Sequence, residues 1–286
     1  MNDPTKRDAP SVLADTIAEM TYPELEGAIA EGAVALWALG VIEEHGPHLP
    51  LATDVYLPSA TLRQVRRRLE HAGQRAVIVP PFYWGVNSVT NLFTGSFVVR
   101  PEIVHGLIVD VLASLDADGL PRVFCLSGHN DSAHNQTVAA AIEQARGECD
   151  TDARFVIDQT MCGYMGLNPR DAHILTYPLQ YPQGKYMDIH AGEGETSMIW
   201  SVAPSLLREE IASGLKPTEL SLPDLMRWRQ GGEQARRTTP DGYFGDPAAG
   251  DPDRGAEMID VQADGVATAI LAALAAETAE NRVGPQ

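Results

Sequence analysis

Acidic and histidine side chains gather between positions 40 and 54, directly after a run of apolar residues. This stretch reads GVIEEHGPHLPLATD, and the apolar residues Ala33 to Ile42 that lead into it predict a buried strand. Open α/β sheets bind ligands beyond the carboxyl ends of their strands. Because alternate residues of an extended chain point the same way, Glu43 and His45 can converge on one point. Asp54 returns at the start of a predicted helix, so the three side chains form a candidate site for a divalent metal ion.

Two other interpretations of this stretch are open. In zinc proteases two histidines one helical turn apart bind the metal, but Gly46 and Pro47 lie between His45 and His48 and argue against a helix there. The plain alternative is a charged loop after a strand, with His48 hydrogen-bonded to the backbone. The stretch taken alone does not separate a metal site from such a loop.

A second polar cluster follows the predicted strand Arg122 to Leu126. His129 and Asp131 repeat the alternate spacing of the first cluster. Adjacent parallel strands bring their ends within ligand distance, so five groups could surround one or two ions: Glu43, His45, Asp54, His129 and Asp131. The alternative for Asp131 is to cap the N-terminus of the helix that follows.

A third cluster surrounds His190. This histidine precedes small residues and a predicted helix start, which places an imidazole beside backbone N–H groups and suits proton transfer or oxyanion stabilisation. The alternative is a helix-capping loop in which Glu193 and Glu195 favour the helix dipole. Taken by itself, the capping interpretation is the better one.

Strand and helix patterns alternate along the chain around these clusters. The predicted strands are Ala33 to Ile42, Arg75 to Val79, Arg122 to Leu126 and Arg154 to Ile157, and the predicted helices are Asp54 to His71, Glu102 to Ala117, Ala133 to Arg146, Gly192 to Val202 and Ala256 to Ala279. This order predicts an α/β fold: one domain over residues 11–286, with a mostly parallel sheet and helices on both faces in α/β/α layers. Residues 1–10 are predicted to be a disordered tail, and Thr238 to Gly255 a long loop.

Composition narrows the function further. The chain has 286 residues and a formal net charge of −18, which argues against nucleic acid as a partner because phosphates need Lys and Arg. No apolar run is expected to span a membrane, and the polar start of the sequence lacks a signal-peptide core, so a cytoplasmic protein is expected. The motifs of serine hydrolases (G-x-S-x-G) and of dinucleotide-binding enzymes (G-x-G-x-x-G) are absent from the positions where those functions need them.

Taken together, the three clusters resemble the motifs of the creatininase family, the creatinine amidohydrolases and their relatives. The matching segments are EEHGPHLP at 43–50, Asp54, Gly128-His129 and HAGEGETS at 190–197, with lesser echoes at 93–96 and 245–247. The resemblance covers roughly residues 33 to 275, and three ordered motifs make it specific. It implies a creatininase-like fold and hydrolysis of a C–N amide bond by a metal-dependent amidohydrolase.

The resemblance also implies roles for the site residues. Glu43, Asp54 and His129 would hold one ion, and His45, Asp54 and Asp131 the other. Two ions of Zn²⁺, Mn²⁺ or Fe²⁺ would lower the pKa of a bridging water and polarise the substrate carbonyl. His190, with Glu193 assigned beside it as catalytic, would protonate the leaving nitrogen.

Three further residues are assigned to the substrate: Asn130, Tyr186 and Asn87. Creatininase has a tyrosine where Asn130 stands, and tryptophan and an acidic residue in place of Tyr186 and Ile189, so creatinine is not the expected substrate. The expected substrate is a small molecule: a cyclic amide or lactam, a formamide or another small amide. The alternatives are a peptidase that trims a short peptide and a non-catalytic metal-binding assembly subunit. A homo-oligomer, a hexamer by resemblance, is also expected.

Overall fold

The computed structural model describes residues 11–181 and 184–283, so the predicted tail at residues 1–10 lies outside the described chain. Its centre is a sheet of five strands in the order β2-β1-β3-β4-β5. Every neighbouring pair is parallel. The strands are β1 (Val34–Leu39), β2 (Ala76–Phe82), β3 (Val123–Ser127), β4 (Arg154–Asp158) and β5 (Ile174–Tyr177).

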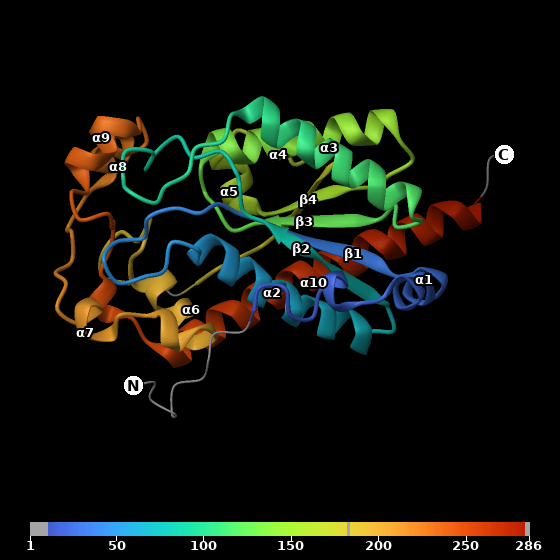
Figure 1. Cartoon of the computed structure of the whole chain (residues 1–286), viewed down its shortest axis with the longest axis horizontal. Helices are drawn as coiled ribbons and strands as arrows, with labels where there is room; N and C mark the ends of the chain where they lie inside the picture. The colour runs from blue at the N-terminus through green and yellow to red at the C-terminus, as the bar shows by residue number, and fades with distance from the viewer. Residues whose placement is uncertain (1–10, 182–183, 284–286) are drawn as a thin grey trace.

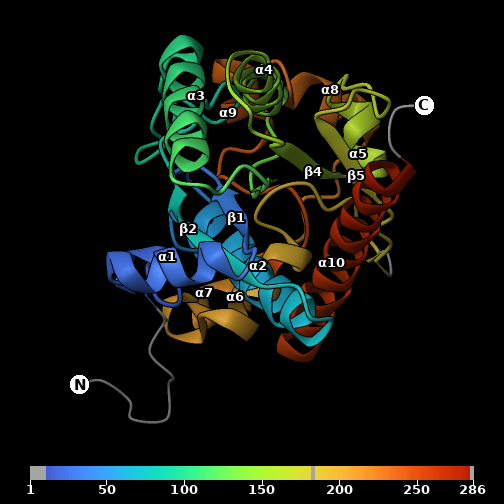
Figure 2. The same ribbon diagram turned by 90° about the vertical axis from the view of Figure 1, so that its right-hand side faces the viewer.

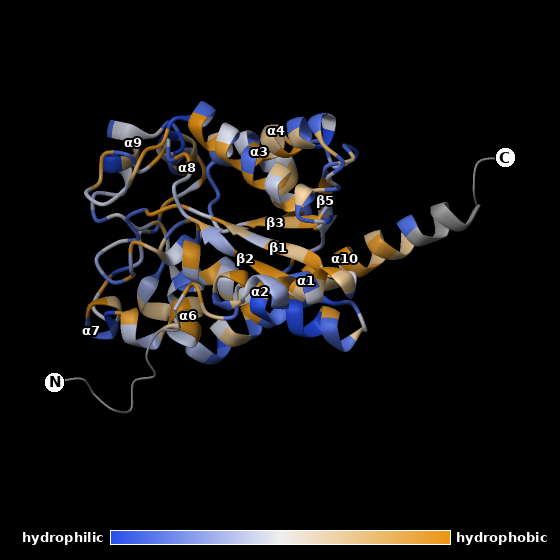
Figure 3. Ribbon diagram, turned by 45° about the vertical axis from the view of Figure 1, so that its right-hand side comes forward, coloured by the Kyte–Doolittle hydropathy of each residue, from blue (hydrophilic) through white to orange (hydrophobic). Residues whose placement is uncertain are grey.

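Helices cover both faces of this sheet (Figures 1 and 2). Helices α3 (Pro101–Ala117) and α4 (Ser132–Glu148) pack on one face, and α2 (Thr53–His71) and α10 (Pro252–Val283) pack on the other. In β1, Trp37 points into the first layer and Leu36 into the second, and both are almost completely buried. A strand buried on both faces needs apolar residues throughout, which is why these strands read as continuous apolar runs. Hydrophobic residues accordingly gather in the middle of the molecule and hydrophilic ones on the outer helix surfaces (Figure 3). The predicted α/β fold is confirmed.

The order of the strands creates the place where a site can form. The chain leaves β1 for β2 on one side and later returns to the other side of β1 with β3. The register runs from Ala35 opposite Val123 to Leu39 opposite Ser127, so the ends of β1 and β3 lie side by side. A crevice opens at such a switch in strand order, beyond the carboxyl ends of the strands.

Elements that the sequence pattern did not predict are mostly short. They are α1 (Tyr22–Ala30), β5, α5 (Gln159–Tyr164), α7 (Glu209–Ala212), α8 (Leu222–Trp228), α9 (Gly232–Thr238) and the 3-10 turns at Ile17–Glu19, Pro204–Leu206 and Pro247–Ala249. Such elements span too few residues to show a periodic pattern. Helices α6 (Glu193–Val202), α7, α8 and α9 gather beyond the carboxyl ends of the strands (Figure 1).

The C-terminal helix corrects two predictions. It begins at Pro252, so the predicted loop over residues 238–255 ends earlier, and that segment also contains a 3-10 turn. Among the described residues, Pro252–Glu277 is long and apolar enough to cross a membrane by length and composition, contrary to the expectation that no run is. Its Val266 and Ile270 are fully buried against the sheet, with Leu274 also buried. The apolar stripe therefore serves as the packing face of a core helix.

Candidate active site

The backbone places Asp54 between the ends of β1 and β3. A Cβ atom added at Gly40 would lie 2.2 Å from the Asp54 carbonyl oxygen, and one added at Gly128 would lie 2.4 Å from it. Only glycine permits so close an approach of one backbone to another. Pro58, in the next turn of α2, has no N–H to donate to that carbonyl, so the ordinary helical hydrogen bond is absent there. Two glycines and one proline thus let the first turn of α2 insert at the edge of the sheet.

The Asp54 carboxylate faces two imidazoles. Its Oδ1 atom lies 3.2 Å from His45 Nε2, and its Oδ2 atom lies 3.0 Å from His129 Nδ1. Glu43 Oε2 lies 2.9 Å from the same His129 nitrogen. Within three groups of residues, the possible ligand atoms lie within 4.8 Å of one another: Glu43, Asp54 and His129 form the first group, His45, Asp54 and Glu195 the second, and Glu43, His45 and His190 the third. Asp54 belongs to the first two of these groups.

Hydrogen bonds to neighbouring groups orient these side chains. His45 Nδ1 donates to the carbonyl of Glu43 over 3.1 Å, which leaves Nε2 directed toward Asp54. Thr90 donates its hydroxyl to Glu43 Oε1 over 2.5 Å. Partners of this kind fix the tautomer and the ring orientation of a metal-binding histidine.

The charges of the cluster show that it fits a cation. Burial lowers the pKa of His45, but the carboxylates of Asp54, Glu195 and Glu43 outweigh it and raise that pKa to about 10. Burial likewise opposes a charge on His129, yet Glu43 and Asp54 hold its pKa well above the usual value. Among the described residues, Glu43 Oε2 and His45 Nε2 are buried without a hydrogen-bond partner. Buried polar atoms left this way cost stability, and a divalent ion with mixed oxygen and nitrogen ligands would satisfy them.

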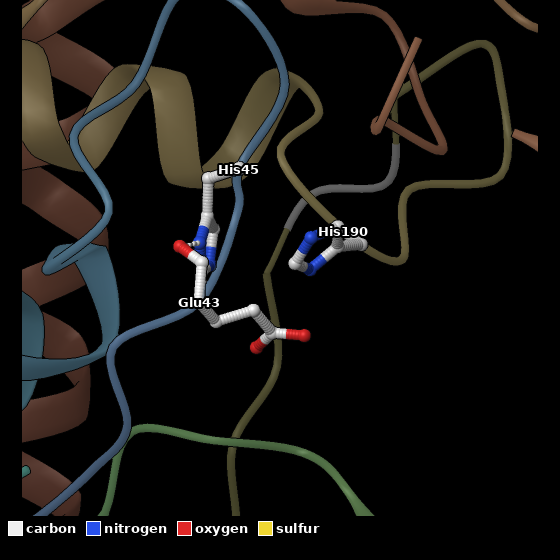
Figure 4. Close-up of side chains that lie close together, drawn as sticks. All are labelled: Glu43, His45 and His190. Carbon is white, nitrogen blue, oxygen red and sulfur yellow. Dashed lines mark hydrogen bonds between the residues drawn. The ribbon is translucent and has the colours of Figure 1, made fainter. Parts of the chain in front are cut away.

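His190 completes the site from the far side. Figure 4 shows its ring and the side chains of Glu43 and His45 turned toward a common space. The ring centroids of His45 and His190 lie 4.4 Å apart. The His190 Nε2 atom donates to the carbonyl of Glu44 over 2.8 Å. Its backbone carbonyl accepts from the Phe244 N–H over 2.7 Å, so the segment predicted as a loop holds the histidine in place.

The proton on His190 is held by its surroundings. Burial and the charge of His45 lower the pKa of His190, but Glu43 and Glu44 outweigh both and raise it to about 9. This raised pKa favours the protonated imidazole that a general acid needs.

The structure places Asp131 at the N-terminus of α4. Its Oδ1 accepts from the backbone N–H groups of Ala133 and His134, and its Oδ2 accepts from the backbone and hydroxyl of Ser88, each over 2.6 Å. Both oxygens accept hydrogen bonds, and Asp131 is in none of the three ligand groups. Asp131 thus makes the hydrogen bonds that the helix-capping alternative predicts.

Glu195, and not Asp131, is in a ligand group with His45 and Asp54. Its Oε2 lies 3.8 Å from His45 Nε2 and accepts from the Ala191 N–H over 2.5 Å. In the sequence, Glu195 is the second glutamate of HAGEGETS. The capping-loop interpretation assigns this residue to the helix dipole and not to the metal. Ala191 adopts a φ of 49°, an unusual value for a residue with a side chain, and so turns this N–H toward the glutamate.

Of the remaining predicted residues, one lines the cavities around the site and three do not. Asn130 lines the cavities around the site. Asn87 is buried behind Thr90 and bonds to it, and the Tyr186 hydroxyl lies 3.5 Å from Glu219, so neither reaches a cavity wall at the site. Glu193 pairs with Arg254 instead of joining the ligand groups. The assignments of Asn87, Tyr186 and Glu193 thus lack support, because tertiary contacts that a sequence pattern does not display engage these side chains.

Two adjoining cavities open onto the cluster. One of about 220 Å³ is lined by Glu43, Asp54, His129, His190 and Trp228. The other, of about 640 Å³, shares Asn130, Met161, His190 and Glu195 with the first. The Trp228 ring lies 5.7 Å from the His190 ring and was missed because it is on a short, unpredicted helix. Ligand pockets are commonly about 300–1,000 Å³, so the larger cavity has room for a substrate of several residues.

Comparisons with known proteins agree with this geometry. The model of the creatininase family, described as creatinine amidohydrolase, matches residues 18–270. The mycofactocin precursor peptide peptidase of Mycobacterium ulcerans is 28% identical over 78% of this chain and 80% of its own length. The creatinine amidohydrolase of Pseudomonas putida is 26% identical over 67% of this chain and 73% of its own. A crystal structure of creatininase superposes with a TM-score of 0.68 at 22% identity, covering 90% of this chain and 96% of that one.

Proposed function

The chain belongs to the creatininase family, and from that membership we propose that it is a metal-dependent amidohydrolase that cleaves a C–N amide bond. One observation carries the proposal: the Asp54 carboxylate stands between His45 and His129, with one oxygen toward each. Further carboxylates, Glu43 and Glu195, flank the two imidazoles. These carboxylates and imidazoles are residues that could hold divalent metal ions.

The residues that would hold the metal follow from the two ligand groups that contain Asp54, since His190 of the third group is assigned to proton transfer. Glu43, Asp54 and His129 would hold one ion, and His45, Asp54 and Glu195 the other. Carboxylate and imidazole ligands suit Zn²⁺, Mn²⁺ or Fe²⁺. One creatininase structure with this fold is named "Creatininase Mn", with a TM-score of 0.69 at 22% identity. When bound, such ions supply Lewis acidity and lower the pKa of water.

The protein's own residues supply the proton. An amide nitrogen is a very poor leaving group unless it is protonated as the bond breaks, and the raised pKa of His190 favours its protonated form. The Glu44 carbonyl fixes the ring through Nε2, and the ring faces the same space as Glu43 and His45. His190 therefore acts as the general acid, while Asn130 lies in the cavity walls where a substrate would bind.

A short peptide is the second candidate substrate. The cavity of about 640 Å³ supports a ligand larger than a single small ring. A relative with 28% identity is a peptidase of a precursor peptide by name. Hydrolysis of a peptide bond uses the same chemistry as hydrolysis of another amide, so the walls of the cavity decide between the two classes.

A substrate screen of metal-loaded protein tests the proposed function. Cyclic amides, formamides and short peptides would be offered to protein loaded with Zn²⁺ or Mn²⁺, and new carboxylate or amine would be detected by mass spectrometry. We expect turnover in at least one class, and its loss after chelation and recovery after metal is restored. Metal-loaded protein without turnover on any class would favour the non-catalytic subunit instead.

The role of His190 has its own test. His190→Gln should keep its metal and lose about 10²- to 10⁴-fold in turnover on an amide, the usual contribution of general acid catalysis. The loss should shrink on activated anilides, whose leaving group needs no proton. A variant that is emptied of metal, or that loses equally on both substrates, contradicts the general-acid role.

We also propose a cytoplasmic homo-oligomer, a hexamer by family resemblance. The Trp84 and Phe97 rings touch at 5.4 Å between centroids and are 44% and 50% exposed, which supports burial of this surface by another subunit. Light scattering after size-exclusion chromatography gives the number of subunits.

A further inference from the structure

One basic side chain of the lysine and arginine type lies in the walls of the active-site cavities. Among the described residues that line them, Arg229 is the single Lys or Arg, at the smaller cavity that also contains Glu43, Asp54 and His190. Six carboxylates line the same cavities: Glu43, Asp54, Asp131, Asp158, Asp188 and Glu195. On a chain of net charge −18, a lone arginine beside these carboxylates needs an explanation in terms of what it binds.

Arg229 is held in place across the cavity. It follows Trp228 at the end of α8, and its guanidinium carbon lies 5.7 Å from the ring centroid of Tyr164 at the end of α5. Met161, on the same short helix as Tyr164, lines the cavity beside it. A planar guanidinium resting on an aromatic face is restrained while its N–H groups stay free to donate. The arginine thus spans α8 and α5 at the rim of the site.

No carboxylate in the described part of the chain forms an ion pair with Arg229. Its near neighbour Arg227 pairs with Asp224 on the same helix and is therefore already neutralised. The two arginines differ in function for that reason: one is compensated within its helix, and the other offers its charge to the cavity.

We propose that Arg229 anchors a carboxylate of the substrate, so that the enzyme prefers amides that carry a free carboxylate, such as a peptide with an unblocked C-terminus. The inference rests on the proposed amidohydrolase function. A guanidinium matches a carboxylate with two parallel hydrogen bonds. A single arginine suits one negative charge, whereas a dianionic phosphate would face the surrounding acids Glu195 and Asp188 with too little compensation.

The binding of hydroxamates with and without a carboxylate tests the role of Arg229, and this test does not require turnover. Hydroxamates bind divalent metal, so monohydroxamates of succinic, glutaric and adipic acid would place a carboxylate at increasing distance from the ions, with matched primary amides as uncharged controls. Isothermal titration calorimetry on metal-loaded protein gives the ratio of affinities within each pair. We expect the carboxylate to bind about 10- to 100-fold more tightly at one chain length, the usual strength of a charge-assisted hydrogen bond.

The variants isolate the residue. Arg229→Gln should bring the ratio to within about twofold of one and leave the affinity for the uncharged probe unchanged, because the metal site is intact. Arg229→Lys should keep part of the preference, and Arg227→Gln should keep all of it. Equal binding of both members of every pair by wild type, an unchanged preference in Arg229→Gln, or tighter binding of a matched phosphonate would overturn the proposal.

Failure of the proposed function is distinguishable from these results. If elemental analysis finds no metal in the protein and neither probe binds, the amidohydrolase assignment fails, and the substrate anchor fails with it. If metal is present and the probes bind without preference, only the role of Arg229 is lost.

Discussion

Asp54 is the residue on which the candidate site depends, because both of its carboxylate oxygens face a histidine. Asp54→Asn keeps the shape of the side chain and removes its charge. We expect elemental analysis to find little metal in this variant, since neither ligand group would keep its shared carboxylate. Asp110→Asn, on the exposed side of α3, is the matched control and should keep the wild-type metal content. Unchanged metal in Asp54→Asn would contradict the bridging role.

We expect Asp131 and Glu195 to exchange the roles that the sequence suggested, with Asp131 capping α4 and Glu195 binding metal. Asp131→Ala should leave the metal content unchanged and lower the free energy of unfolding by about 0.5–2 kcal/mol, the cost of a lost N-cap. Glu195→Gln should do the reverse in metal binding and reduce occupancy from about two ions toward one, because an amide lacks the charge of a carboxylate. Denaturant unfolding and elemental analysis of both variants give the answer. Metal loss in Asp131→Ala alone would restore the original assignment.

The spacing of residues in the sequence was enough to predict that five site residues lie together. It was not enough to predict which of the neighbouring carboxylates joins them. Glu43, His45, Asp54, His129 and His190 converge because each follows a strand or precedes a helix whose ends the fold must bring together. Whether Asp131 or Glu195 joins the ligand groups depends on the backbone N–H groups that bind each carboxylate. Asp131 meets those of Ala133 and His134, and no spacing rule contains that information.

At the scale of the elements, the meeting of β1, β3 and α2 is set by backbone atoms. A methyl group at position 128 would come 2.4 Å from the Asp54 carbonyl oxygen, so Gly128→Ala must push the helix away. We expect a loss of about 1–3 kcal/mol in the free energy of unfolding, the usual cost of overpacking, together with weaker metal binding.

A second glycine provides the control. Gly106, within α3, has nothing within 4 Å of its would-be Cβ. Gly106→Ala should therefore raise the free energy of unfolding by about 0.5–1 kcal/mol, since alanine favours a helix. Equal effects of the two substitutions would mean that contact with Asp54 is unimportant.

The long elements followed from the sequence, and the short ones did not. Strands buried on both faces and helices with an apolar stripe carry their pattern over enough residues to be recognised. Helices α5 and α8 have 6 and 7 residues, and their positions are fixed by contacts with the rest of the chain. These two helices carry Tyr164, Trp228 and Arg229, so the substrate side of the site was less predictable than the metal side.

For the whole molecule, acid should destabilise the fold through buried neutral histidines. Burial, together with the charges of His45 and His190, lowers the pKa of His48 from its ordinary value of 6.5 to about 4. The folded state therefore binds this proton less readily than the unfolded chain does. The stability that depends on the neutral ring is present above pH 6.5 and is lost as the pH falls toward 4.

The expected size of this effect is on the order of 3 kcal/mol, at about 1.4 kcal/mol for each pKa unit. Chemical unfolding of chelated protein between pH 7 and 4 should show a shallower decline for His48→Gln than for wild type. His71→Gln, at an exposed position of α2, should follow the wild-type curve. A His48→Gln curve parallel to that of wild type would contradict the prediction.

The tight contacts of Gly40 and Gly128 with Asp54 also bear on how this protein can change through evolution. The floor of the site is built from backbone packed against backbone, so we expect most substitutions of these glycines to lower stability. The rim is built from side chains on and next to α5 and α8, of which Tyr164 and Arg229 are exposed. Mutation can therefore exchange one substrate for another at the rim while the chemistry beneath stays constant. A library randomised at the rim should contain mostly folded proteins with altered selectivity, and one randomised at the floor should contain few.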